Sequence, residues 1–104
     1  MPSADKADTM ARALQAEGVP ASKIYGGQPV YAARQILNQW TIADGCPFNC
    51  PSFFPQPIKY EMGMCPRSEE LLACAVGISV GPFYEEEDLE DIITSVQKVC
   101  YHLL

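Results

Sequence analysis

Basic residues are scarce in this 104-residue chain, which has 7 Lys and Arg against 13 Asp and Glu and a net charge of −6. Nucleic acids and anionic membranes attract Lys and Arg, so neither is expected as a partner. Long apolar runs are lacking too: no stretch approaches the roughly 18 apolar residues of a membrane span, and residues 1–6 have no apolar core typical of a signal peptide. We therefore expect a soluble, cytoplasmic protein.

Motifs that carry catalysis are also lacking. No Gly-x-Ser-x-Gly, Walker loop or Gly-x-Gly-x-x-Gly occurs, and Gly26-Gly27 is too short to cradle a phosphate. The one histidine, His102, stands beside an apolar helix face near the last residue, where a packing or surface role is more common than a role as base. The length allows one domain, which is small for an enzyme that encloses a cofactor. No catalytic residue is predicted in this chain.

The five cysteines are predicted to be reduced thiols, since there is no export signal and an odd count leaves one unpaired. Cys74 and Cys100 fall on apolar faces of predicted helices, which is typical of small buried hydrophobes. Zinc is the main alternative chemistry, with a Cys3His set made of Cys46, Cys50, Cys65 and His102. The Cys-x3-Cys spacing argues against it, because zinc modules usually carry Cys-x2-Cys.

Cys65 also permits a redox interpretation. It precedes a predicted helix and has Arg67 close by, two features that lower the pKa of a thiol. A simple helix-capping role explains the same position without redox chemistry. Capping is the interpretation that the sequence favours.

Helical periodicity is clearest at the two ends of the chain. Residues 4–17 predict an amphipathic helix that Gly18 stops, and residues 86–102 predict a second one that begins with a run of carboxylates. The apolar stripe of the second helix comprises Leu89, Ile92, Ile93, Val96, Val99, Cys100 and Leu103. Its acidic start resembles a cation site, but the dipole of a helix favours carboxylates there without any ligand.

The middle of the chain predicts shorter elements. A turn after Val19 leads into a short strand that ends at Gly26, and Pro29 opens a helical turn that reaches Leu37. Pro66 begins another helix, which Gly77 is expected to end, and Ile78–Val80 then predicts a strand. Together these elements indicate one small α/β domain of the α+β type, a short sheet packed by amphipathic helices.

Residues 45–57 form a turn-rich excursion with aromatic anchors. Phe48, Phe53 and Phe54 must be covered, either by their own domain or by a partner. Both possibilities stay open from the sequence. The partner possibility makes these three residues candidate interface residues.

Several motifs stand in an order that resembles the C-terminal small domain of the DegT/DnrJ/EryC1/StrS aminotransferases, which use pyridoxal phosphate to aminate ketosugars and cyclitols. They are Leu14-Gln15-Ala16-Glu17-Gly18-Val19, Tyr25-Gly26-Gly27-Gln28-Pro29-Val30-Tyr31, Cys65-Pro66-Arg67-Ser68-Glu69 and Glu86-Glu87-Asp88. The resemblance spans nearly the whole chain and is most specific from Tyr60 onward. It implies a fold-type I enzyme whose large domain holds the cofactor.

This resemblance implies that Tyr25, Gln28 and Tyr31 contact substrate. It also implies that the chain supports a homo-oligomer, most simply a dimer, and closes one side of the substrate cleft. None of Lys6, Lys23, Lys59 and Lys98 lies in the Ser-Gly-x-x-Lys-like setting that forms the Schiff base with the cofactor. The chain alone is therefore expected to be inactive and to bind no cofactor. The runner-up is a free-standing interaction module with the same fold.

Overall fold

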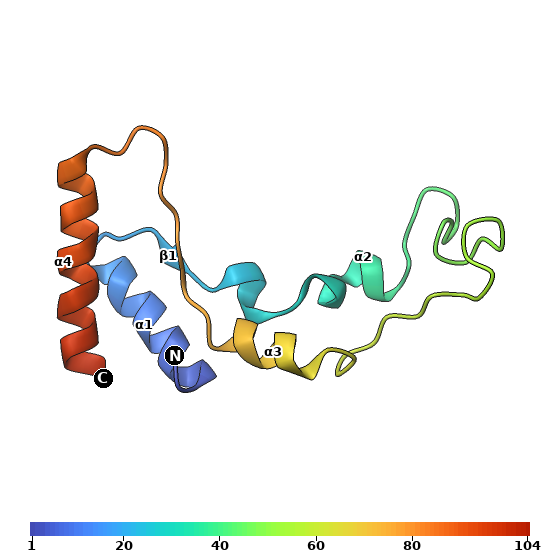
Figure 1. Ribbon diagram of the computed structural model, residues 1–104, viewed down its shortest axis with the longest axis horizontal. Coiled ribbons are helices and arrows are strands. Elements are labelled where there is room, and N and C mark those ends of the chain that lie inside the picture. The colour runs from blue at the N-terminus through green and yellow to red at the C-terminus, as the bar shows by residue number, and fades with distance from the viewer.

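The computed structural model describes residues 1–104 and shows an elongated molecule of 54 × 31 × 17 Å (Figure 1). Its radius of gyration is 18.7 Å, whereas a compact chain of about 100 residues has about 13 Å. Two parts account for the shape. We call α1 (Ala4–Ala16), β1 (Ala21–Ser22), β2 (Gly77–Ile78) and α4 (Glu86–Leu103) the base. Residues 28–64 are the arm, which extends to the opposite end of the molecule in Figure 1.

The first helix, α1 (Ala4–Ala16), begins and ends as its sequence predicts. The Ser3 hydroxyl accepts a hydrogen bond from the Lys6 N–H at 3.2 Å, which caps the N-terminus. At the other end Gly18 has φ +86°, the left-handed conformation that glycine adopts without strain. The Val19 N–H bonds to the Leu14 carbonyl at 2.9 Å and the Gly18 N–H to the Gln15 carbonyl at 3.0 Å, which is a Schellman motif.

The last helix, α4 (Glu86–Leu103), is capped by its own acidic residues. The Glu85 N–H donates to the Asp88 carboxylate at 2.9 Å, and the Glu85 side chain accepts from the backbone of Asp88. The run of carboxylates therefore has a structural explanation. Lys98 ties the helix to the end of α1 through both Glu17 oxygens at 2.8 Å.

Packing of α1 against α4 makes the core of the base. The buried cluster comprises Met10, Leu14, Val19, Ala21 and Val99. The predicted apolar stripe of α4 is only partly covered, because Leu89 and Ile93 are 38% and 56% exposed. Ile93 is exposed although Ile92 and Val96 on either side of it are half-buried, so it lies at the edge of the stripe.

A two-stranded antiparallel sheet joins the two halves of the chain. β1 (Ala21–Ser22) pairs with β2 (Gly77–Ile78), with Ala21 opposite Ile78 and Ser22 opposite Gly77. The chain is thus a small α+β domain, as predicted. The prediction that Gly77 ends a helix is wrong, since Gly77 lies in β2, where an added Cβ would stand 3.1 Å from Ile24 Cγ1.

Short helical pieces lie between the base and the arm and in the first part of the arm. η1 (Ile24–Gly27) and η2 (Val30–Ala32) are 3-10 turns, α2 (Arg34–Leu37) is one helical turn, and α3 (Pro66–Ala73) packs near η1. The predicted helix after Pro29 is broken in two, because Ala33 is extended with ψ 132°. None of the helices is long and apolar enough to cross a membrane.

Candidate functional site

The predicted substrate residues divide between two places. Tyr25 and Gln28 line one shallow hollow of about 290 Å³, together with Pro29, Val30, Ala32 and Ala33. Tyr25 is 71% exposed and takes a left-handed conformation with φ 50°. Tyr31 does not line this hollow. Substrate contact by Tyr25, Gln28 and Tyr31 stays a prediction.

Tyr31 instead anchors the arm to α3. Its hydroxyl donates a hydrogen bond to Glu69 Oε1 and accepts one from the Cys65 N–H at 3.3 Å. The same Glu69 oxygen accepts from the Gly63 N–H at 2.6 Å. No side chain caps η2. The hydrogen bonds of Tyr31 with Glu69 and Cys65 therefore hold the first part of the arm in place.

The hydrogen bonds around Tyr31 and Glu69 shift the pKa values of both side chains. Partial burial, and then the hydrogen bond to Glu69, raise the pKa of Tyr31 above its usual value, while the Cys65 N–H opposes the shift. The bonds from Tyr31 and Gly63 lower the pKa of Glu69. At neutral pH the pair is a neutral phenol bound to a carboxylate, which is a positioning contact and offers no free base.

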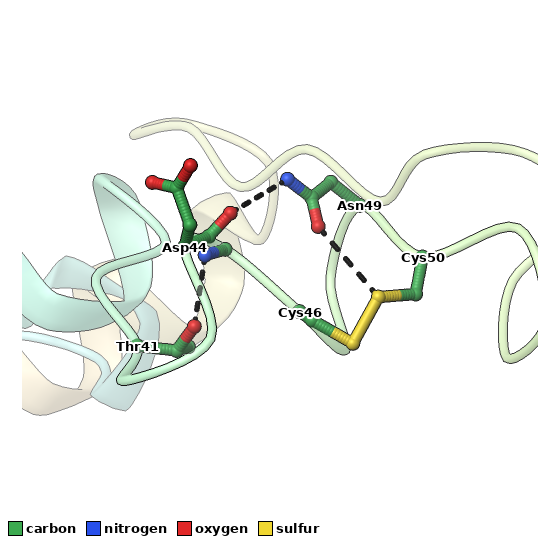
Figure 2. The surroundings of a disulfide bond; sticks show 6 residues. Thr41, Asp44, Cys46, Asn49 and Cys50 are labelled. Carbon is green, nitrogen blue, oxygen red and sulfur yellow. Dashed lines mark hydrogen bonds between the residues drawn. A yellow bond between two sulfur atoms is a disulfide. The ribbon is translucent and has the colours of Figure 1, made fainter.

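A disulfide between Cys46 and Cys50 closes the loop near the end of the arm, so the expectation of five reduced thiols is wrong (Figure 2). The turn from residue 46 to residue 50 brings their Cα atoms to 5.2 Å, within the range that a disulfide spans. The Gly45 N–H donates to Thr41 Oγ1 at 2.8 Å, and Asn49 Nδ2 donates to the Asp44 carbonyl at 3.0 Å. These bonds fold the loop back on itself.

The other three cysteines are free thiols. Cys65 stands at the N-cap position of α3, as predicted, but its exposed side chain makes no hydrogen bond to the first turn of the helix, so the predicted capping bond is absent. Cys74 and Cys100 are half-buried. Because Cys46 and Cys50 are bonded to each other, they cannot serve as thiolate ligands in the zinc set considered above.

The three candidate interface residues differ in exposure. Phe48 is half-buried and meets the Tyr60 ring edge-to-face with centroids 5.9 Å apart, and Phe54 is also half-buried. Phe53 is 67% exposed. Only Phe53 therefore presents most of its ring to a partner, while Phe48 packs on the arm itself.

Two of the four lysines of the chain are held in ion pairs. Lys23 Nζ lies 3.1 Å from Asp8 Oδ1, and Lys98 is held by Glu17. No lysine lines the hollow of Tyr25 and Gln28. That another segment holds the cofactor stays a prediction.

Comparison with protein-family models, with curated proteins and with solved structures gave no match to this chain. Two features escaped the sequence analysis. One is Glu69 as the partner of Tyr31, which lies 38 residues away along the chain. The other is a polar hollow around Trp40, whose only sequence signal is a tryptophan set among amide and hydroxyl side chains.

Proposed function

We propose that the chain is the C-terminal small domain of a cytoplasmic, pyridoxal-phosphate-dependent ketosugar or cyclitol aminotransferase. The motif order from Leu14 to Asp88 is the sequence support for this proposal. The structural observation that carries it is the arm. A chain of 104 residues that buries only 9 of them has surface that a larger body must cover.

In this role the base is the folded anchor and the arm reaches over the substrate cleft. Tyr25 and Gln28 face a hollow at the root of the arm, where a phenol and an amide can position substrate hydroxyls. The contact between Tyr31 and Glu69 keeps that root attached to α3. The chain contributes orientation and exclusion of water, while a large domain supplies the lysine and the cofactor.

A cytoplasmic setting has a consequence for the arm. Cellular reductants keep cytosolic thiols reduced, so in this setting Cys46 and Cys50 are expected as the dithiol.

The first experiment is titration of the purified chain with pyridoxal phosphate. We expect no defined absorbance band of a protonated Schiff base, because the chain lacks the lysine setting. A stoichiometric band that borohydride fixes on one lysine contradicts the proposal that a separate large domain supplies the lysine.

The second experiment reads the coding region immediately upstream. We expect an in-frame or adjacent segment encoding a large domain with a Ser-Gly-x-x-Lys-like motif. When that segment is joined to this chain, cofactor binding and amino transfer from an amino acid to a ketosugar or cyclitol should appear together. A joined protein that folds and binds the cofactor but transfers no amino group to either acceptor class counts against the proposed activity.

A second candidate is a free-standing interaction module, and the same exposed arm favours it. Phe53 and the neighbouring surface are open to any partner protein. An upstream region without a large domain, combined with a partner whose binding is lost in Phe53→Ser, supports this candidate over the first.

A further inference from the structure

The disulfide between Cys46 and Cys50 closes a short ring of the chain, residues 46–50, and neither the resemblance nor the proposed function gives it a role. In the chain-entropy model, the stabilisation that a disulfide gives to the folded state falls with the length of the loop that it closes. A ring this short therefore adds little to the stability of the whole chain. Its effect is expected in the conformation of the arm.

Two turns meet at this disulfide. Cys46 ends the first turn, because its N–H donates to the Ala43 carbonyl at 3.1 Å. Cys50 begins the second turn, because its carbonyl accepts from the N–H groups of Phe53 and Phe54 at 3.1 and 3.0 Å. The bond between the two sulfur atoms thus fixes the position of one turn relative to the other.

The other contacts of the ring are ordinary hydrogen bonds. The Asn49 N–H donates to the Gly45 carbonyl at 3.2 Å, and Asn49 Nδ2 donates to the Asp44 carbonyl at 3.0 Å (Figure 2). Asn49 and Asp44 are both exposed, so water competes for the hydrogen bond between them. The disulfide is the contact of the ring that water cannot replace.

Phe48, midway between the two cysteines, connects the ring to the returning segment of the arm. Its carbonyl accepts a hydrogen bond from the Ile58 N–H at 3.4 Å, and its ring meets the Tyr60 ring edge-to-face. The Ile58 carbonyl in turn accepts from the Gln39 amide of the outgoing segment. The conformation of the ring is therefore coupled to the contact between the two segments of the arm.

The ring is open to small reagents. Pro47 and Asn49 are exposed, and the two cysteines are half-buried. Accessible disulfides exchange with small thiols more readily than buried structural disulfides do. Neither sulfur atom is enclosed in the core of the base, which is formed by α1, β1 and α4.

We propose that Cys46 and Cys50 form a redox-responsive site that reacts with low-molecular-weight disulfides of the glutathione class. In the disulfide form the ring seats Phe48 against residues 58–60, and in the dithiol form this contact is released. In a cytosolic setting the dithiol is the resting form, so a rise in oxidised glutathione is the signal. The proposal does not depend on the aminotransferase role, because the reacting groups and the contact that they control lie within this chain.

The oxidation proceeds by two thiol–disulfide exchanges. The thiolate of one cysteine attacks a sulfur atom of glutathione disulfide, whose S–S bond breaks, and one glutathione thiolate leaves. The thiolate of the other cysteine then attacks the protein sulfur atom of this mixed disulfide, and the second glutathione thiolate leaves. The two protein thiols lose two electrons and two protons in total, and one glutathione disulfide becomes two glutathione thiols. An excess of reduced glutathione reverses both steps.

The first measurement titrates the pair. The full chain is equilibrated in buffers that differ in the ratio of reduced to oxidised glutathione, its free thiols are alkylated, and mass spectrometry distinguishes the internal disulfide from glutathione adducts. We expect the pair to pass from dithiol to disulfide between the ratios of the cytosol and of a secretory compartment. A pair that stays oxidised, or stays reduced, over this whole range overturns the proposal.

The second measurement follows the arm by amide hydrogen exchange in the oxidised and the reduced chain. Reduction should speed exchange at the Ile58 amide several-fold, because Phe48 no longer holds this segment, while amides in α1 and α4 keep their protection. Equal exchange at Ile58 in the two states overturns the coupling of the disulfide to the arm.

Variants assign the response to this pair. Cys46→Ser combined with Cys50→Ser should exchange at Ile58 as fast as the reduced chain and should no longer respond to glutathione. Cys65→Ser is the matched control and should keep the full response, because Cys65 is an exposed free thiol outside the ring. A response that survives in the double variant, or is lost in Cys65→Ser, overturns the assignment. The reduced unmodified chain gives the same comparison without any substitution.

Discussion

The Tyr31 hydroxyl donates a hydrogen bond to the Glu69 carboxylate and thereby joins residues 38 positions apart. Tyr31 belongs to the arm and Glu69 to α3, which packs near η1. This contact, with the N–H groups of Gly63 and Cys65, connects the root of the arm to the section of chain that returns to the base. Although the arm is long, these hydrogen bonds connect its outgoing segment at Tyr31 with its returning segment at Gly63 through Glu69.

Tyr31→Phe removes the hydroxyl group and should break the contact between the arm and α3 without unfolding the base. The Cys65 N–H loses its acceptor, and the Gly63 N–H keeps a Glu69 carboxylate that the Tyr31 hydroxyl no longer positions, so both amide hydrogens should exchange several-fold faster, while amides in α1 and α4 remain protected. Tyr60→Phe is the control, because the Tyr60 hydroxyl has no hydrogen-bond partner. Unchanged exchange at both glycine and cysteine amides in Tyr31→Phe contradicts the anchoring role.

The hydrogen bond between Tyr31 and Glu69 should weaken at both low and high pH. The folded-state pKa of Glu69 lies below its ordinary value of 4.5, so its contribution is present above that value and is lost as the pH falls through the lowered pKa. The pKa of Tyr31 lies above its ordinary 10.0, so its contribution is present below that value and is lost as the pH rises through the raised pKa. Exchange at the Gly63 amide, corrected for its intrinsic pH dependence, should be slowest between these limits.

Stability should depend on the interface of α1 and α4. Leu14 is 1% exposed, and Leu14→Ala should cost about 2–5 kcal/mol in the free energy of unfolding. Ile92 is only half-buried, so Ile92→Ala should cost about 1 kcal/mol, less than a fully buried position. Ile93→Ala, at 56% exposure, is the control and should stay within about 0.5 kcal/mol. Urea denaturation followed by circular dichroism measures all three, and equal losses for Leu14→Ala and Ile93→Ala would refute the packing described.

The oxidised chain should present three reactive thiols out of five cysteines. Cys65 should react first, because it is exposed while Cys74 and Cys100 are half-buried. After reduction all five should react. A chelator should leave the melting temperature unchanged; one bound zinc per chain, lost together with structure in Cys46→Ser, is the result that restores the zinc interpretation.

The isolated chain should self-associate through its arm. Phe53, Trp40 and Ile42 are all more than half exposed, and exposed apolar surface favours association. Phe53→Ser should shift the population toward monomer in light scattering. Phe48→Ser is the informative comparison, because Phe48 packs on Tyr60 and should affect the order of the arm more than association. A clean monomer at high concentration argues for a self-contained module.

Local signals of the sequence determined the helices of the base. Residues at 3.6-residue spacing and a glycine at the position that needs a positive φ predicted α1 to within one residue, and the acidic N-terminus predicted the start of α4. These features depend on neighbours within about five positions. They are therefore readable without knowledge of the fold.

Tertiary structure alone decided which of the predicted residues meet. Tyr25 and Gln28, three positions apart, line one hollow, whereas Tyr31 turns to Glu69, and Leu89 and Ile93 of the α4 stripe stay exposed. The pairing of Cys46 with Cys50 likewise depends on the turn that brings their Cα atoms to 5.2 Å. Periodicity reports which face of a helix is apolar, whereas burial and pairing depend on the length and path of a second segment, which no local pattern encodes.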